Sequence, residues 1–114
     1  MATFEIIRFE VRDGTEPAVE VAMHAFASYV HRELPGSWWT GYRESARSTT
    51  FVALLRTADA AAAARHHAAP GTHAFDAALA PLLVGPVTTT PYALVTSSDL
   101  GPRPRAGRAA SRRR

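Results

Sequence analysis

The order of its apolar segments is the feature that most constrains what this chain can fold into. Residues 4–11 read as a strand, with Phe4 and Ile6 on one face and Ile7, Phe9 and Val11 on the other. Residues 37–46 and 49–57 follow as two more strands joined by a short polar turn. Residues 87–96 read as a last strand, in which Pro91 indicates an edge position or a bulge because proline cannot donate a ladder hydrogen bond.

Helical patterns separate these strands. Thr15 and Pro17 are typical of a helix start, with Thr15 as the capping residue, and the helix is expected to run to about Glu33. Apolar side chains recur along it in steps of three or four and make one stripe: Val19, Met23, Phe26 and Val30.

A second helical region is broken in two. Asp59 is expected to cap a helix over residues 60–69, and Thr72 is expected to cap a further helical segment that ends at Gly85. The order is therefore β-α-β-β-α-β. It predicts an α+β, ferredoxin-like fold, in which a four-stranded antiparallel sheet carries its helices on one face.

Two of the predicted strands are apolar on both faces. The paired sets are Phe4 and Ile6 against Ile7 and Phe9 in one strand, and Phe51 and Leu55 against Val52 and Leu54 in the other. Since helices cover only one face, the other would expose an apolar patch well beyond what monomers usually show. We therefore expect a homodimer in which two sheets pack face to face.

The positive charge is concentrated at one end of the chain. All 13 basic residues are arginines, and the 10 acidic residues leave a net charge of +3. Six arginines fall in the last 12 residues: Arg103, Arg105, Arg108, Arg112, Arg113 and Arg114. We expect a domain over residues 1–98 and a disordered, arginine-rich tail over residues 99–114, which makes nucleic acid an unlikely partner of the domain.

Composition also excludes several classes of protein. The chain has no cysteine, so it can form no disulfide, thiol nucleophile or cysteine-ligated zinc site. No secretory signal and no membrane-spanning apolar run are visible, and a cytoplasmic protein without membrane contact is the expectation. His24 and His31 share a helical face with Glu20, which we interpret as a solvated face and not as a metal site.

Three segments in this order resemble a known family: residues 34–36 leading into a strand that ends Gly41-Tyr42-Arg43, residues 59–70 with His66, and residues 74–83 with Phe75 and Leu82-Leu83. The chain is similar over residues 4–96 to the antibiotic biosynthesis monooxygenase family. The resemblance implies a dimeric α+β barrel. The wider superfamily also includes haem-degrading enzymes and polyketide cyclases.

The chain also departs from the family pattern. Where the family often has an acidic residue, arginine and tryptophan, this chain has Leu55, Arg56 and Thr57, and its first strand has no asparagine. Haem degradation is therefore disfavoured. The histidine often found after the second helix is replaced by Gly71, with His73 two positions later.

The resemblance implies oxygenation by O2 without flavin, metal or haem, and no cofactor is expected. The substrate would be an aromatic polyketide, anthrone or quinol. Such chemistry needs a base of near-neutral pKa, and His66, at the family's helix histidine, is the candidate. The alternative is a histidine that packs or caps the helix end.

Two more residues are candidates for catalysis. Arg56 could steady a substrate anion, or form a salt bridge at a strand end. Tyr42 could donate a hydrogen bond to a substrate oxygen, or to a backbone carbonyl.

Candidates for substrate binding are the aromatic residues Trp38, Trp39 and Phe26, together with His73. One tryptophan should face the helices and the other the dimer partner, but a slip of one residue in register would reverse the two. Gly41 is expected to leave space beside Trp39, and plain core packing is the alternative for either tryptophan.

Two rival functions remain open: a cyclase or isomerase on the same fold, and a noncatalytic ligand-binding protein.

Overall fold

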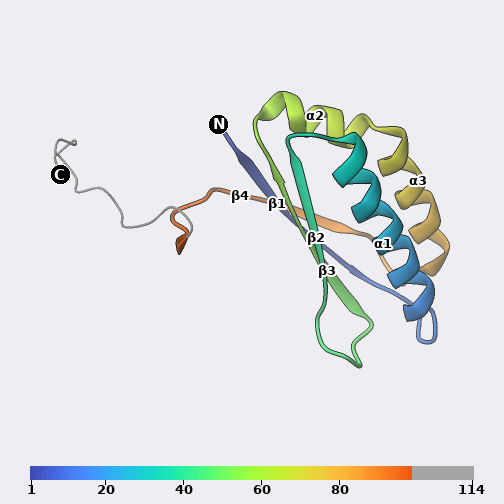
Figure 1. The fold of residues 1–114 in the computed structure, drawn as a ribbon. Coiled ribbons are helices and arrows are strands. Elements are labelled where there is room, and N and C mark those ends of the chain that lie inside the picture. Colours follow the sequence, from blue (N-terminus) through green and yellow to red (C-terminus); the bar gives the residue numbers. More distant parts are fainter. Residues whose placement is uncertain (99–114) are drawn as a thin grey trace, which may run out of the picture.

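The predicted order of strands and helices is confirmed in the computed structural model, which describes residues 1–98 (Figure 1). The elements are β1 (Thr3–Glu10), α1 (Glu16–Glu33), β2 (Ser37–Arg43), β3 (Thr50–Thr57), α2 (Ala60–Ala68), α3 (Pro70–Leu79), a short 3-10 turn (Ala80–Leu82) and β4 (Thr88–Tyr92). The strands form one antiparallel sheet in the order β2-β3-β1-β4, with the helices on one side. This is the predicted α+β, ferredoxin-like fold. The tail over residues 99–114 lies outside the described residues.

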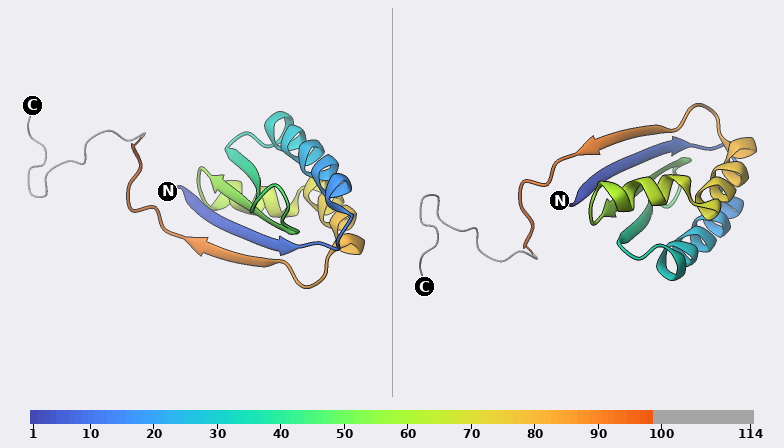
Figure 2. Two further views of the ribbon diagram at one scale, coloured as in Figure 1. Left: turned by 90° about the horizontal axis from the view of Figure 1, so that it is seen from below. Right: turned by 90° about the horizontal axis from the view of Figure 1, so that it is seen from above.

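The two edge strands differ in how the helices cover them. The strand β2 lies beneath α1, whereas β4 lies beyond β1 on the side away from α1, as both views of Figure 2 show. All five residues of β4 are exposed, and Pro91 pairs with Glu5 on this outermost strand. The prediction of an edge strand at Pro91 is therefore confirmed.

The helix-facing side of the sheet carries the core. In the centre of that face Phe9 of β1 stacks on Phe51 of β3, with ring centroids 5.7 Å apart. The predicted stripe of α1 packs against these rings, and its four residues are buried: Val19, Met23, Phe26 and Val30. Because successive side chains of a strand point to opposite faces, the apolar side chains of β1 and β3 are divided between the two faces of the sheet.

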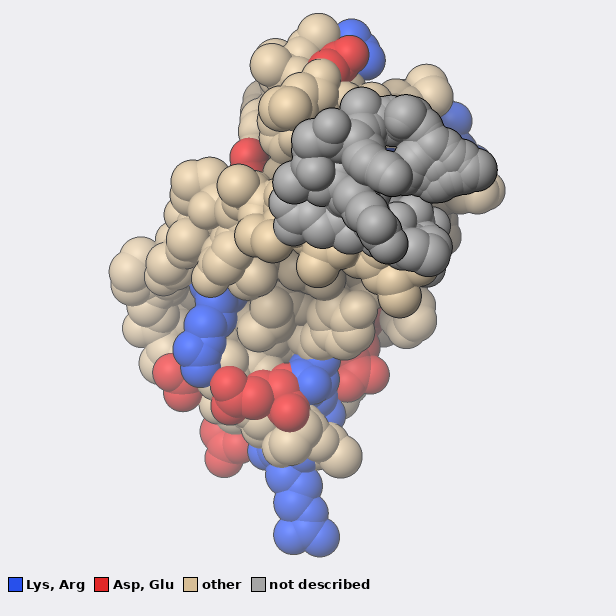
Figure 3. All heavy atoms as spheres, turned by 90° about the vertical axis from the view of Figure 1, so that its left-hand side faces the viewer, with Lys and Arg blue, Asp and Glu red and all other residues tan. Residues whose placement is uncertain are grey.

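The opposite side of the sheet is left uncovered by this chain. It carries mostly apolar and aromatic side chains: Phe4, Ile6, Trp38, Tyr42, Val52, Leu54, Arg56 and Tyr92. The side chains of Trp38 and Tyr42 are 49% and 51% exposed. Figure 3 views the molecule from the left-hand side of Figure 1. Most charged atoms lie at its lower end and a few at its upper end, with largely uncharged atoms visible between them. We call the uncovered side of the sheet the outer sheet face.

Two of the predicted helix caps differ in the structure. Thr15 precedes α1, but its hydroxyl donates to the carbonyl of Arg12 (2.6 Å) and caps no helix N–H. Thr72 lies inside α3, which begins at Pro70, because proline fits the first helical position, where no N–H is needed. The cap at Asp59 is confirmed, since its carboxylate accepts from the backbone N–H of Ala62 (2.8 Å).

Within residues 1–98 no helix has the length and apolar character needed to cross a membrane. The cytoplasmic location remains a prediction.

Candidate functional site

A cavity of about 440 Å³ lies between the helix-facing side of the sheet and the helices α2 and α3. Its apolar walls are Ile7, Phe26, Trp39, Leu55, Phe75 and Leu79. Its polar groups are His66, His67, Thr72, Asp76 and Thr89. A mostly apolar cavity with a few polar groups is the usual form of a small-molecule site.

Three aromatic rings make one rigid wall of this cavity. Phe26 stacks on Phe75 with centroids 4.6 Å apart, and Trp39 meets both rings edge-on, at 5.1 and 5.6 Å. Such stacked and edge-to-face pairs hold one another in place. The predictions that Phe26 and one tryptophan line the pocket therefore agree with the geometry, and Trp39 is the tryptophan that does so.

The imidazole of His66 is the most deeply buried polar group at the cavity, with 3% of the residue exposed. Its ring lies 5.6 Å from Phe26, and its Nδ1 is buried with no hydrogen-bond partner among the described residues. Burial, with a further contribution from His67, lowers the pKa of His66 from 6.5 to about 4, against an opposing effect of Glu5. His66 is therefore neutral at pH 7, and one ring nitrogen is free to accept a proton. Its pKa lies well below the near-neutral value expected of the base, so the imidazole in the single chain is a weaker proton acceptor than predicted.

Local interactions fix the backbone that carries His66. The Asp59 cap starts α2, and the hydroxyl of Thr72 donates to the carbonyl of His66 (2.5 Å). The same carbonyl, at the end of α2, also accepts from the backbone N–H of the C-cap residue Ala69 (3.3 Å), so the hydroxyl of Thr72 is its second donor. Thr72, which does not cap α3, thus links α3 to the backbone of His66, the candidate base.

Glu5 and His67 form a second polar pair that sequence reasoning missed. The Nε2–H of His67 donates to Oε2 of Glu5 (3.1 Å), while Oε1 of Glu5 is buried with no partner among the described residues. The sequence does carry a signal for this pair. Glu5 and Ile7 are two residues apart in β1, so the Glu5 side chain lies on the same, helix-facing side of the sheet. A charged residue in the middle of that face needs a partner from the helix layer.

Three other predicted site residues lie on the outer sheet face, away from this cavity. Arg56 of β3 stacks over the ring of Trp38 on β2, with its guanidinium carbon 4.4 Å from the ring centroid. Tyr42 lies two positions along β2 from Thr40, in phase with Trp38. Within the described residues of one chain, the structure therefore does not bring Arg56, Tyr42 or Trp38 together with His66, and their roles in catalysis or substrate binding remain predictions.

One further prediction differs in the structure, and another agrees with it. His73 is exposed on α3 and does not line the cavity with His66. Gly41 lines a different cavity beside Trp39, in agreement with the space expected there. A Cβ at Gly41 would overlap the methyl group of Met23.

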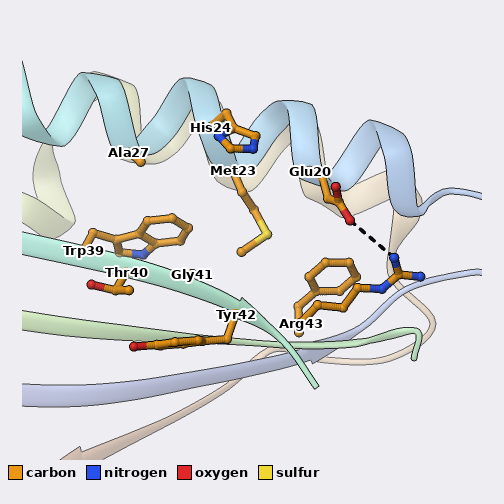
Figure 4. A pocket seen from close by; sticks show the side chains of 10 residues that line it. Glu20, Met23, His24, Ala27, Trp39, Thr40, Gly41, Tyr42 and Arg43 are labelled. Atoms are coloured by element: carbon orange, nitrogen blue, oxygen red, sulfur yellow. Dashed lines mark hydrogen bonds and ion pairs between the residues drawn. The ribbon is translucent and has the colours of Figure 1, made fainter. Parts of the chain in front are cut away.

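A second cavity, of about 380 Å³, lies on the other side of Trp39, between α1 and the edge strand β2. In Figure 4 the side chain of Met23 points down from α1, and the ion pair between Glu20 and Arg43 (3.3 Å) closes one end. Tyr42 lines this cavity and not the one with His66. No three histidine or acidic side chains within residues 1–98 are grouped as metal ligands would be.

Comparisons with known proteins place the fold. No protein-family model matches the chain, and no curated protein matches it. Solved structures do match, with TM-scores above 0.7. Rv0793 from Mycobacterium tuberculosis (TM-score 0.75, 24% identity) covers 86% of this chain and 99% of its own. The match to a putative antibiotic biosynthesis monooxygenase from Caulobacter crescentus has a TM-score of 0.77 and 18% identity, and it covers 83% of this chain and 91% of the other. The match to SnoaB of Streptomyces nogalater, described as a cofactor-independent oxygenase, has a TM-score of 0.72 and 23% identity, and it covers 84% of this chain and 95% of the other.

The chain therefore has the fold of the structures named antibiotic biosynthesis monooxygenases, and the resemblance noted in the sequence is confirmed at the level of the fold. Each of these likenesses is below 25% identity, so the comparisons define the architecture. The chemistry has to be argued from the site.

Proposed function

We propose that this protein is a cofactor-independent monooxygenase that oxidises a flat hydroxylated aromatic substrate, such as an anthrone or a quinol, with O2. The observation that carries the proposal is the unprotonated, buried imidazole of His66 at the wall of an aromatic cavity. The fold shared with SnoaB, described as a cofactor-independent oxygenase, supports it.

The proposed reaction begins with removal of a proton. His66 accepts a proton from the acidic position of the substrate and leaves an electron-rich anion in the cavity. That anion passes one electron to O2, the two radicals combine into a carbon-bound peroxide, and the O–O bond then breaks. For an anthrone, a CH2 group becomes a carbonyl. His66 takes one of its two hydrogens as a proton, and the second leaves carbon as the O–O bond breaks. One oxygen atom stays on carbon, and the other leaves as water with these two hydrogens.

The aromatic wall has two roles in this proposal. The rings of Trp39 and Phe75 offer apolar surfaces against which a flat substrate can stack. They also exclude water, which keeps the anion and the peroxide from side reactions. No residue of this wall supplies charge, so the acid–base work falls to the imidazole groups.

The test uses purified full-length protein and an anthrone under air. O2 consumption and incorporation of labelled oxygen into the product should exceed the uncatalysed background. A His66→Ala variant should lose most of the rate, on the order of a hundredfold or more for a missing general base, whereas His73→Ala on the exposed face of α3 should not. No oxygen gain across a panel of anthrones and hydroquinones would refute the proposal.

An anaerobic arm separates the rival functions. A cyclase or isomerase in the same cavity would convert its substrate without O2, and a noncatalytic binding protein would take up the aromatic molecule and return it unchanged. Loss of turnover on removing O2 is the result expected of an oxygenase.

We also propose that two copies pair through the outer sheet face, which would place Trp38, Tyr42 and Arg56 between two sheets. The support is the size and apolar character of that face in the single chain. Leu54→Glu puts a charge in its centre and should convert a dimer into a monomer in light scattering. Val21→Glu, on the exposed side of α1, is the matched control and should leave the mass unchanged.

A further inference from the structure

The charged groups around the His66 cavity are acidic. Asp76 of α3 lines it directly, and Glu5 of β1 lies behind His67. Within residues 1–98 no arginine lines the cavity, and the chain contains no lysine. The arginine predicted to hold a substrate anion, Arg56, is on the outer sheet face.

The negative charge of Glu5 is only partly neutralised. One of its oxygens accepts from His67, and the other is buried without a partner among the described residues. The field of this carboxylate reaches the cavity, since Glu5 raises the pKa of His66 against the larger effect of burial. A second negative group placed in the cavity would therefore be repelled from two sides, by Glu5 and by Asp76.

We propose that the His66 cavity selects uncharged hydroxylated aromatic ligands and rejects the same ring systems when they carry a carboxylate. This inference rests on the proposed function for the aromatic nature of the ligand. A carboxylate that entered would lose its hydration and find no arginine or lysine among the described residues that line the cavity, only the imidazole groups of His66 and His67, which is costly for any buried charge. A hydroxyl group loses far less, because His66, Thr72 or Thr89 can hydrogen-bond with it.

The acidic surroundings also determine where the substrate proton goes. With no arginine among the described residues that line the cavity, the imidazolium made when His66 takes the proton can serve as the counter-charge of an anion formed there. The proton therefore stays beside the anion as an ion pair until the oxygen atoms are ready to receive it. Glu5, which favours the charged form of His66, supports this pairing.

The test compares three probes built on one ring: a dihydroxyanthraquinone, its carboxylic acid and its aminomethyl derivative. These quinones are already oxidised, so binding is measured without turnover, by equilibrium dialysis and by quenching of tryptophan fluorescence in the full chain at pH 7.5. The Trp38→Phe variant reports quenching of Trp39 alone. We expect the neutral probe to bind at least about tenfold more tightly than the carboxylate, and the aminomethyl probe to bind no more weakly than the neutral one.

Two variants link the selectivity to the named carboxylates. Asp76→Asn and Glu5→Gln should each improve binding of the carboxylate probe by about three- to tenfold and leave binding of the neutral probe nearly unchanged. Glu44→Gln, in the β2–β3 hairpin where Glu44 pairs with Arg8, is the control and should leave the preference as it is.

Equal or tighter binding of the carboxylate, or no binding of the neutral probe up to its solubility limit, would overturn the inference. The same holds if the preference survives both variants. A clear preference in a protein that consumes no O2 with the matching anthrone would support the inference and refute the proposed oxygenase function, so the two failures are distinguishable.

Discussion

The burial of His66 predicts that this protein loses stability in mild acid. The pKa of His66 is about 4 in the folded chain and about 6.5 when the side chain is exposed. As the pH falls, the unfolded chain therefore binds the proton first, and protonation favours unfolding. Well above pH 6.5 the histidine is neutral in both states and takes nothing from the free energy of unfolding. Below about pH 4 it is protonated in both states, and the loss of stability is complete.

The size of the effect follows from the difference between the two pKa values. The complete loss amounts to about 3 kcal/mol, of which about 2 kcal/mol appears between pH 7 and pH 5. This is a large part of the stability of a small domain, which is typically on the order of 5–15 kcal/mol. Because only 3% of the residue is exposed, solvent screens the effect little.

The assay is urea unfolding at pH 7 and pH 5, with the free energy of unfolding compared between wild type and His66→Gln. The amide cannot be protonated in this range, so the variant should lose about 2 kcal/mol less than wild type on acidification, whatever its absolute stability. His73→Gln is the control, since that histidine is exposed on α3.

One result would refute the reasoning. If wild type and His66→Gln lose the same free energy between pH 7 and pH 5, then His66 is not held neutral by burial. The assignment of His66 as an imidazole that burial keeps unprotonated in mild acid would then have lost its physical basis. A matching loss in His73→Gln and wild type is expected, and would show that removal of an exposed histidine does not by itself change the pH dependence.

Further predictions concern the packing around the site. Trp39→Ala should lower the free energy of unfolding by about 3 kcal/mol, measured by urea unfolding, because it removes the ring that Phe26 and Phe75 pack against. Asp59→Ala should cost about 1 kcal/mol, visible as a lower melting temperature, because it removes the cap of α2. Gly71→Ala should cost about 1–2 kcal/mol, since a Cβ there would overlap the ring of Tyr29, and an equal effect of Gly85→Ala, where a Cβ meets open space, would contradict that explanation.

Local patterns were enough to place the elements. The apolar stripe of α1 and the cap at Asp59 depend on neighbours in sequence, and both appear in the structure as predicted. Thr72 was misjudged as a cap because Pro70 is itself a good first residue of a helix, so α3 starts earlier. The hydroxyl of Thr72 was then free to bond to the carbonyl of His66.

The candidate site was predicted only in part. The choice between Trp38 and Trp39 depends on which face of β2 the helices cover, and a period of two gives the alternation without saying which phase is inside. The pairing of Arg56 with Trp38 follows from the register between β2 and β3, which no local pattern reports. Glu5 was overlooked for the same reason, since its partner His67 is 62 residues away.

The sequence by itself determined the β-α-β-β-α-β order, the apolar stripes and the candidate base, because these follow from residue spacing along one element. The tertiary structure decided which side chains share a cavity. It placed His66 in one cavity with Trp39 and Phe75. Arg56 and Tyr42 do not line that cavity. Asp76 lines it, and Glu5 lies near enough to raise the pKa of His66. The physical reason is that charge and burial at a site are sums over side chains from distant segments, and only the packing of helices on the sheet fixes which of them meet.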